Sequence, residues 1–244
     1  MVRKTHFVPG WSFPKEALDR NREANKGHVR YSAMADVPAG THLAVIGGGP
    51  SVKGFLDELK AWAGDIWAIN GAFGWCLDNG IDATFYTLDA SPVLKDMASR
   101  AGNAILADNC DPDVSGAVNG SVHLVEMGDT PCGSSSASTA PMLAALRGYS
   151  SVTLFGCESS FVGAEHAYQW SHVTTSRVLV ECDGREFLTT PQLIMQAEYV
   201  AEIARNVPGY VSVRGIGFLP ALIVAGDYSI LKVSRDILGG SGGH

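Results

Sequence analysis

The chain has 244 residues, 46% of them hydrophobic and 18% charged, so it can bury a core of ordinary size and is expected to form one main domain. This composition excludes disordered and fibrous proteins. The net charge of -7 argues against a nucleic-acid partner, because a phosphate backbone is bound by clustered Lys and Arg, and no such cluster occurs beyond Arg3 and Lys4. A small anionic ligand stays open, because backbone amides can hold phosphate.

The five cysteines are an odd number, lie far apart and form no CxxC pair. This pattern is typical of buried free thiols in a reducing compartment. The N-terminus lacks an apolar stretch of signal-peptide length, and no segment reaches 18 uninterrupted apolar residues. We therefore expect a cytoplasmic protein with no membrane partner. A homo-oligomer is compatible with the sequence.

The polar residues 1–40 are expected to form an N-terminal extension that packs onto the domain through Trp11 and Phe13. A single Rossmann-like domain is expected over 41–238. The last residues, 239–244, read GGSGGH and resemble a linker followed by the start of a purification tag.

Short apolar segments alternate with helical ones from residue 42 onward. Strands are expected at 42–47, 65–70, 83–90, 103–109, 121–127 and 151–159, with helices after Pro50, at 71–79 and at 135–147. The apolar runs are continuous rather than alternating, which indicates strands buried on both faces. The sequence therefore predicts an α/β fold, a Rossmann-like three-layer sandwich with a mostly parallel sheet. Pro141 is expected to delay the start of its helix or to kink it.

The pattern changes after Phe161. Asp183-Gly184 lies between two β-prone arms and predicts a hairpin with a type I′ turn, so 161–190 is taken as a β-hairpin insertion. Pro191 begins an amphipathic helix, and a last strand is expected at 210–217.

A glycine-rich turn, "VIGGGPS", follows the first strand. Gly47, Gly48 and Gly49 allow a sharp turn, Pro50 suits the first helical position, and Ser51 adds a hydroxyl there. The GxGxxG spacing is missing, Asn70 ends the second strand where an acidic residue would bind ribose, and no GK[ST] occurs. A nicotinamide site and a P-loop are therefore disfavoured. The turn predicts a phosphate site, the alternative being close packing of the strand on the helix.

Three segments together resemble a known family: "VIGGGPS", "IWAINGAFGWCLDNGIDATFYTLDASP" and "GSSSASTAPMLAALRGYSSVTLFGCESSF". In this order they are similar to the MptE-like (DUF115) family, named for an archaeal 6-hydroxymethyl-7,8-dihydropterin diphosphokinase and including short phage-encoded members. The resemblance covers residues 42–170. The GPS turn also looks, more distantly, like that of bacterial sialyltransferases that use a CMP-sugar.

The resemblance to the MptE-like family implies a nucleotide whose phosphates lie over the turn. By position, the phosphate would contact Gly47, Gly49, Pro50 and Ser51, and the nucleotide would be bordered by Asn70 and Gly71. Asp89 would end the third strand, and Glu158 stands where the family has Asp, which keeps the charge and lengthens the reach.

Three further features supply candidate chemistry. Asp89 and Glu158 could hold Mg²⁺ for transfer from ATP, although Asp89 could simply cap the helix near Ser91. The turn Gly133-Ser134-Ser135 suits phosphate or ribose contacts, and a plain loop is the alternative. In "EHAYQW", His166 could act as general acid or base, or be structural, and Tyr168 could stack on a flat ring.

Three functions remain open. The first is a Mg²⁺-dependent transferase that passes diphosphate from ATP to a hydroxymethyl group on a pterin-like heterocycle, with His166, Asp89 and Glu158 as catalytic residues. The second is a metal-independent glycosyltransferase that uses a CMP-sugar. The third is a nucleotide-binding module without catalysis. In each case the partner is a small-molecule nucleotide, joined in the first two by a heterocyclic or sugar acceptor.

Overall fold

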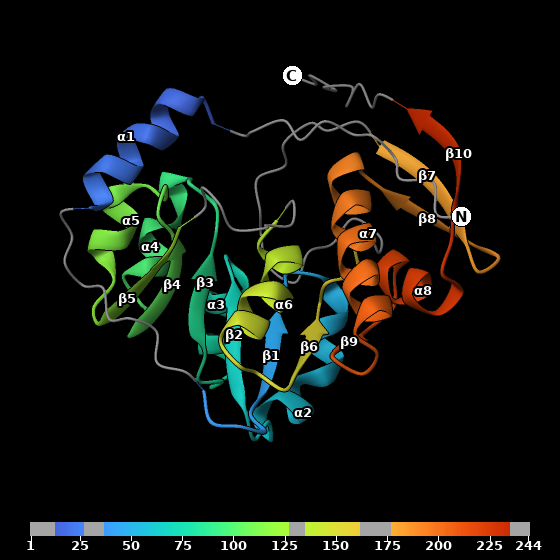
Figure 1. Cartoon of the computed structure of the whole chain (residues 1–244), viewed down its shortest axis with the longest axis horizontal. Coiled ribbons are helices and arrows are strands. Elements are labelled where there is room, and N and C mark those ends of the chain that lie inside the picture. Colours follow the sequence, from blue (N-terminus) through green and yellow to red (C-terminus); the bar gives the residue numbers. More distant parts are fainter. Residues whose placement is uncertain (1–12, 27–36, 127–134, 162–176, 235–244) are drawn as a thin grey trace, which may run out of the picture.

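The computed structural model describes residues 13–26, 37–126, 135–161 and 177–234. Seven strands form one sheet in the order β5-β4-β3-β2-β1-β6-β9, and all of their pairings are parallel (Figure 1). The strands are β1 (His42–Ile46), β2 (Asp65–Ile69), β3 (Thr84–Thr87), β4 (Asn103–Ala107), β5 (Ser121–Val125), β6 (Ser151–Phe155) and β9 (Val211–Arg214). The predicted α/β fold with a mostly parallel sheet is confirmed.

The side chains of β1 explain the three layers. Leu43 and Val45 point to one face and pack with α6 (Ser136–Leu146), α7 (Pro191–Asn206) and α8 (Phe218–Ala225). Ala44 and Ile46 point to the other face. There they pack with α2 (Leu56–Lys60), α3 (Ala72–Asp78), α4 (Lys95–Ala98) and α5 (Pro112–Ala117). Both faces are apolar because helices cover both of them.

A second, antiparallel sheet has the order β10-β7-β8 and lies beyond α7 and α8 at the β9 edge (Figure 1). Its hairpin joins β7 (Arg177–Cys182) to β8 (Arg185–Thr189), with φ of 54° at Asp183 and 68° at Gly184, as a type I′ turn requires. The hairpin prediction is confirmed. The third strand, β10 (Ser229–Ser234), pairs with β7 and was not predicted.

Two helices differ in detail from the expected ones. After Pro50 the chain first makes a 3₁₀ segment, η1 (Pro50–Phe55), because Gly54 weakens a regular α-helix there. The helix α6 runs through Pro141 and begins at Ser136. It does not start late, because Ser135 and Ser138 form a reciprocal capping box that fixes its N-terminus.

The N-terminal part of the described chain packs against the corner between β4 and α5. Helix α1 (Lys15–Asn25) ends in Asn25, which is 1% exposed and donates to the carbonyls of Asp108 and Cys110 at 2.9 and 2.8 Å. The Ser115 hydroxyl donates to the Asn25 side chain at 2.8 Å. These bonds hold α1 in place. Trp11 lies outside the described residues.

The four described cysteines, Cys76, Cys110, Cys157 and Cys182, are buried free thiols, as predicted. Burial raises the pKa of Cys76 and that of Cys110 to about 12. Among the described residues no helix is long and apolar enough to cross a membrane.

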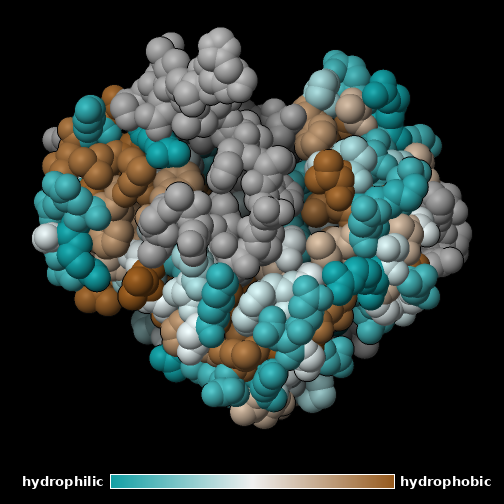
Figure 2. Space-filling model, turned by 180° about the vertical axis from the view of Figure 1, so that it is seen from behind, coloured by the Kyte–Doolittle hydropathy of each residue, from teal (hydrophilic) through white to brown (hydrophobic). Residues whose placement is uncertain are grey.

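Hydrophobic side chains that remain exposed occur in several separate spots on the face seen in Figure 2, with hydrophilic residues between them. The exposed large hydrophobic residues include Val93 and Leu146, and four more lie in α8 and β10, namely Val224, Ile230, Leu231 and Val233.

Candidate functional site

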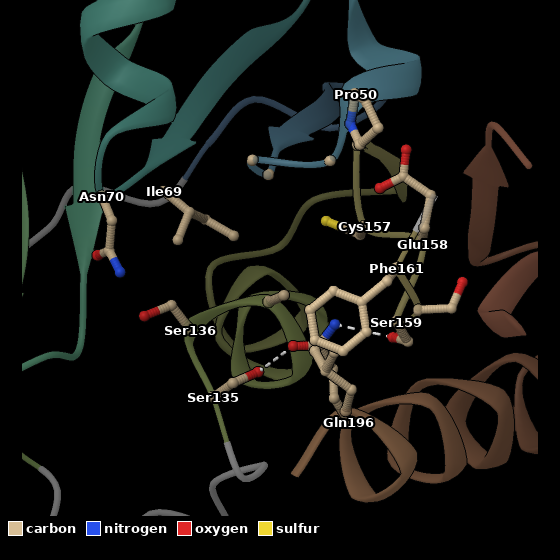
Figure 3. A pocket seen from close by; sticks show the side chains of 17 residues that line it. Pro50, Ile69, Asn70, Ser135, Ser136, Cys157, Glu158, Ser159, Phe161 and Gln196 are labelled. Atoms are coloured by element: carbon tan, nitrogen blue, oxygen red, sulfur yellow. Dashed lines mark hydrogen bonds between the residues drawn. The ribbon is translucent and has the colours of Figure 1, made fainter. Parts of the chain in front are cut away.

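The strand order reverses at β1. The chain runs from β1 outward through β2, β3, β4 and β5, and then returns to place β6 on the other side of β1. In open parallel sheets the loops leaving two such strands diverge, and ligands bind in the crevice between them. A cavity of about 310 Å³ lies at this point, at the carboxyl ends of β1, β2 and β6 (Figure 3).

The cavity brings together most of the described residues that the sequence singled out. Its lining is Gly47, Gly48, Gly49, Pro50, Ile69, Asn70, Ser135, Ser136, Ala137, Gly156, Cys157, Glu158, Ser159, Ser160, Phe161, Leu193 and Gln196. Ser51, Gly71 and Asp89 do not line it.

The glycine turn is held closely against the end of β6. The Gly47 N–H donates to the carbonyl of Phe155 at 2.7 Å, and the Gly49 N–H donates to that of Gly156 at 2.8 Å. A Cβ on Gly47 would lie 2.5 Å from the Gly156 oxygen. The glycine turn therefore packs tightly against the end of β6, in line with the close-packing alternative given for this turn. It also forms one wall of the cavity.

Glu158 lies over this turn. Its side chain is carried by the segment after β6, is 3% exposed, and accepts a hydrogen bond from the Ser51 N–H at 3.0 Å through Oε1. A Cβ on Gly49 would lie 1.3 Å from Oε2. The Ser51 hydroxyl is buried and has no hydrogen-bond partner among the described residues.

Asn70 has a left-handed backbone at the end of β2, with φ of 49°. Its Oδ1 atom is buried and has no partner within the described chain. Ser159, at the end of β6, also has a positive φ, 54°. Two of the three described non-glycine residues with positive φ thus line the cavity, and such strain gathers at functional sites.

A chain of polar side chains on the opposite wall was not predicted. The Ser135 hydroxyl donates to Gln196 Oε1 at 2.7 Å, and Gln196 Nε2 donates to the Ser159 hydroxyl at 2.9 Å (Figure 3). These bonds join α6, α7 and the end of β6. The sequence held a signal for Gln196: it falls on the apolar face of α7, three residues after Leu193 and four before Val200, and is 8% exposed.

Asp89 makes a local turn. Its Oδ1 accepts the N–H of Ser91, two residues on, at 3.0 Å. The N-cap of the 3₁₀ segment that follows (Pro92–Leu94) is Ser91, and that segment has no side-chain cap bond, so Asp89 does not cap it. Burial raises the pKa of the Asp89 carboxyl, and the bond from Ser91 opposes this shift. Within the described ranges no group of three or more His, Cys, Asp or Glu side chains could hold a metal ion.

The raised pKa of Asp89 predicts a pH-dependent effect of Asp89→Asn. A carboxyl whose pKa is higher in the folded state stabilises the fold below its ordinary pKa and loses that contribution as pH rises through the raised value. Asp89→Asn keeps a side-chain oxygen that can accept the Ser91 N–H, and it removes the negative charge. We expect it to raise the free energy of unfolding by urea near pH 7 and to have no such effect near pH 3.

The matched control is Asp111→Asn. Asp111 likewise accepts the N–H of the residue two positions on, that of Asp113 at 2.9 Å, but it does so as the N-cap of α5. It should give no gain near pH 7, because a helix N-terminus favours an anionic cap. A gain for Asp89→Asn that persists unchanged near pH 3 would show that the pKa shift is not its cause.

The remaining predicted site residues, Gly133, Ser134, His166 and Tyr168, lie outside the described residues.

No protein-family model matches the chain, and no curated protein does. The fold is similar to that of the MAf glycosyltransferase from Magnetospirillum magneticum AMB-1, with a TM-score of 0.62 and 17% sequence identity. The match covers 85% of this chain and 38% of that one, so the chain spans well under half the length of this structural neighbour. At this identity the likeness establishes the fold.

Proposed function

We propose that the cavity binds a nucleotide-activated donor and that the protein is a transferase of the glycosyltransferase kind. The observation that carries this proposal is the position of the cavity, at the carboxyl ends of β1 and β6 where the strand order reverses. Parallel α/β sheets bind nucleotides at this place. The fold neighbour, described as a glycosyltransferase, favours the same class.

The lining suits such a ligand. Ile69, Phe161 and Leu193 provide apolar surface, and in Figure 3 the ring of Phe161 projects into the cavity, where a flat base or sugar could pack against it. Asn70 and Ser136 add polar groups that can fix orientation. The volume is at the lower end of the range for small-molecule sites, which fits part of a nucleotide sugar.

In the proposed reaction the acceptor hydroxyl oxygen would form a bond to the anomeric carbon of the sugar, the bond from that carbon to the phosphate oxygen would break, and the nucleoside phosphate would leave. The reaction needs charge stabilisation at the departing phosphate and a base for the acceptor hydroxyl. His166 is proposed for protonation or charge stabilisation at the leaving phosphate, and Tyr168 for stacking. Helix α6 adds the N–H groups of its first turn at the cavity wall, where Ser136 and Ala137 lie.

A second candidate is Mg²⁺-dependent transfer of diphosphate from ATP to a hydroxymethyl heterocycle. It is favoured by the carboxylate of Glu158 at the cavity wall, because carboxylates hold Mg²⁺. Glu158 would hold the ion at the cavity wall, and the ion would neutralise charge on the phosphates. Asp89, the other ligand expected from the sequence, does not line the cavity.

A thermal-shift screen separates the two candidates. The probes are CMP, CMP-sialic acid, UDP-glucose, GDP-mannose and ATP, each with EDTA and with Mg²⁺. A nucleotide sugar at about 100 times its dissociation constant should raise the melting temperature by roughly 5–10 °C in EDTA. Stabilisation by ATP in Mg²⁺ alone would favour the diphosphate transferase. No shift with any probe would contradict nucleotide binding.

Asn70→Gly tests whether the ligand occupies this cavity. Glycine adopts the positive φ of Asn70 without strain, so the melting temperature of the free protein should change little. Loss of the amide should weaken nucleotide-sugar binding about tenfold or more, measured by titration calorimetry. The matched control is Asp183→Gly in the exposed hairpin turn, where φ is 54°. Equal affinity in both variants would place the ligand elsewhere.

A further inference from the structure

The carboxylate of Glu158 is unusual because it is buried without a cation. The side chain is 3% exposed, and no Lys, Arg or His among the described residues forms an ion pair with it. Burying an uncompensated carboxylate is costly. Its single side-chain hydrogen bond comes from the Ser51 N–H and uses Oε1. Oε2 has no donor within the described chain and is not one of the fully buried atoms that lack a partner, so solvent reaches it.

The fold holds this side chain in a fixed place. Oε2 lies against Gly49, where a Cβ would come within 1.3 Å, and a Cβ on Gly217 would lie 2.5 Å from the Glu158 Cβ. The Glu158 carbonyl accepts the Leu219 N–H at 2.8 Å. Gly49 thus leaves room for the carboxylate and Gly217 for the Cβ and backbone of Glu158, and both Gly49 and Glu158 line the cavity.

The same contacts decide which ligand group can lie here. The N–H groups of Gly47, Gly49 and Ser51 donate to Phe155, Gly156 and Glu158, so these three amides are already occupied within the protein. A phosphate beside Glu158 would face a like charge in a region of low dielectric, which is unfavourable. A hydrogen-bond donor would instead supply what Oε2 lacks.

We infer that Glu158 accepts a hydrogen bond from a sugar hydroxyl of the nucleotide donor, and that the phosphates lie away from the glycine turn. This inference rests on the proposed nucleotide-sugar function. The hydroxyl can come from the ribose or from the transferred sugar. Glu158 is then the residue that sets which end of the donor lies at the turn, a role different from the magnesium ligand that the sequence suggested.

The test is Glu158→Gln, which keeps the size of the side chain and an oxygen for the Ser51 N–H but removes the charge. The control is Glu181→Gln, because Glu181 also accepts a backbone N–H, that of Gly184 at 2.9 Å, in the exposed hairpin. Titration calorimetry measures the dissociation constants of the wild type and both variants, in EDTA and in Mg²⁺. The compounds are CMP, UDP and GDP, their 2′,3′-dideoxy forms, and the nucleotide sugars CMP-sialic acid, UDP-glucose and GDP-mannose.

We expect Glu158→Gln to weaken binding tenfold or more without metal, and Glu181→Gln to leave it unchanged. If a ribose hydroxyl donates the hydrogen bond to Glu158, the wild type should bind a ribonucleotide more tightly than its dideoxy form, and Glu158→Gln should bind the two equally. If a hydroxyl of the transferred sugar donates it, Glu158→Gln should lose affinity only for the nucleotide sugars. Unchanged or tighter binding by Glu158→Gln, or a loss seen only with Mg²⁺, would overturn the inference and leave nucleotide binding intact. Failure of every probe to bind the wild type would overturn the proposed function itself.

Discussion

Replacing Gly156 by Ala is expected to lower the free energy of unfolding by roughly 3–4 kcal/mol. Gly156 has φ of 63°, which a residue with a Cβ adopts only at a cost. The added Cβ would also lie 2.7 Å from the Gly47 oxygen and 3.1 Å from that of Gly49. Because these atoms are backbone, β1 and β6 would have to separate where the cavity begins. Urea unfolding measures the change.

Gly226→Ala is the control for the backbone strain alone. Gly226 ends α8 with φ of 83°, and nothing lies within 4 Å of a Cβ placed there. Gly226→Ala should lower the free energy of unfolding by about 1 kcal/mol. Equal losses in the two variants would show that the close contact of the glycine turn with β6 adds nothing to stability.

Gly49→Ala is expected to lower the free energy of unfolding by about 3 kcal/mol, because the new Cβ clashes with Glu158. Gly49 has φ of -72° and ψ of 145°, which alanine adopts freely, so the backbone contributes no strain. The clash is with the carboxylate, whose Oε2, Cδ and Oε1 would lie 1.3, 2.2 and 2.6 Å from the new Cβ. The Glu158 carboxylate would have to leave the Ser51 N–H.

A double-mutant cycle isolates this contact. Adding Glu158→Ala to Gly49→Ala removes the clash, so the double variant should be more stable than the sum of the two single losses by about 2 kcal/mol. Gly54→Ala, in the same η1 segment and with nothing within 4 Å of its Cβ, should not lower the free energy of unfolding and should raise it slightly. Additive losses in the cycle would mean that Gly49 is needed for a reason other than Glu158.

The parallel sheet could be predicted because its signal is local. The strands from β1 to β6 are short, mainly apolar runs between polar turns. The hairpin between β7 and β8 was also predictable, because Asp183-Gly184 is typical of a type I′ turn. By contrast, α8 reads FLPALIVA, which has no polar face and therefore no helical period. Strand β10 pairs with β7, about fifty residues earlier, and such pairing leaves no local mark.

Part of the lining of the cavity could be predicted from the sequence, but its contacts could not. Gly49, Asn70 and Glu158 were each singled out by motif order, and the fold brings all three to one cavity. The bond between Ser51 and Glu158 spans 107 positions, and no spacing rule predicts it. That contact changes the meaning of the glycine turn, because three of its N–H groups bind protein oxygens rather than facing a ligand.

We propose that a nucleotide sugar binds at the carboxyl ends of β1 and β6. Hydrogen–deuterium exchange of the wild type, with and without saturating CMP-sialic acid, UDP-glucose or GDP-mannose, tests it most directly, because exchange locates the protected segments. We expect slower exchange in the peptides that carry residues 47–51, Asn70 and residues 156–161 with at least one of these donors. Protection confined to other segments, or none with any donor, would contradict this proposal.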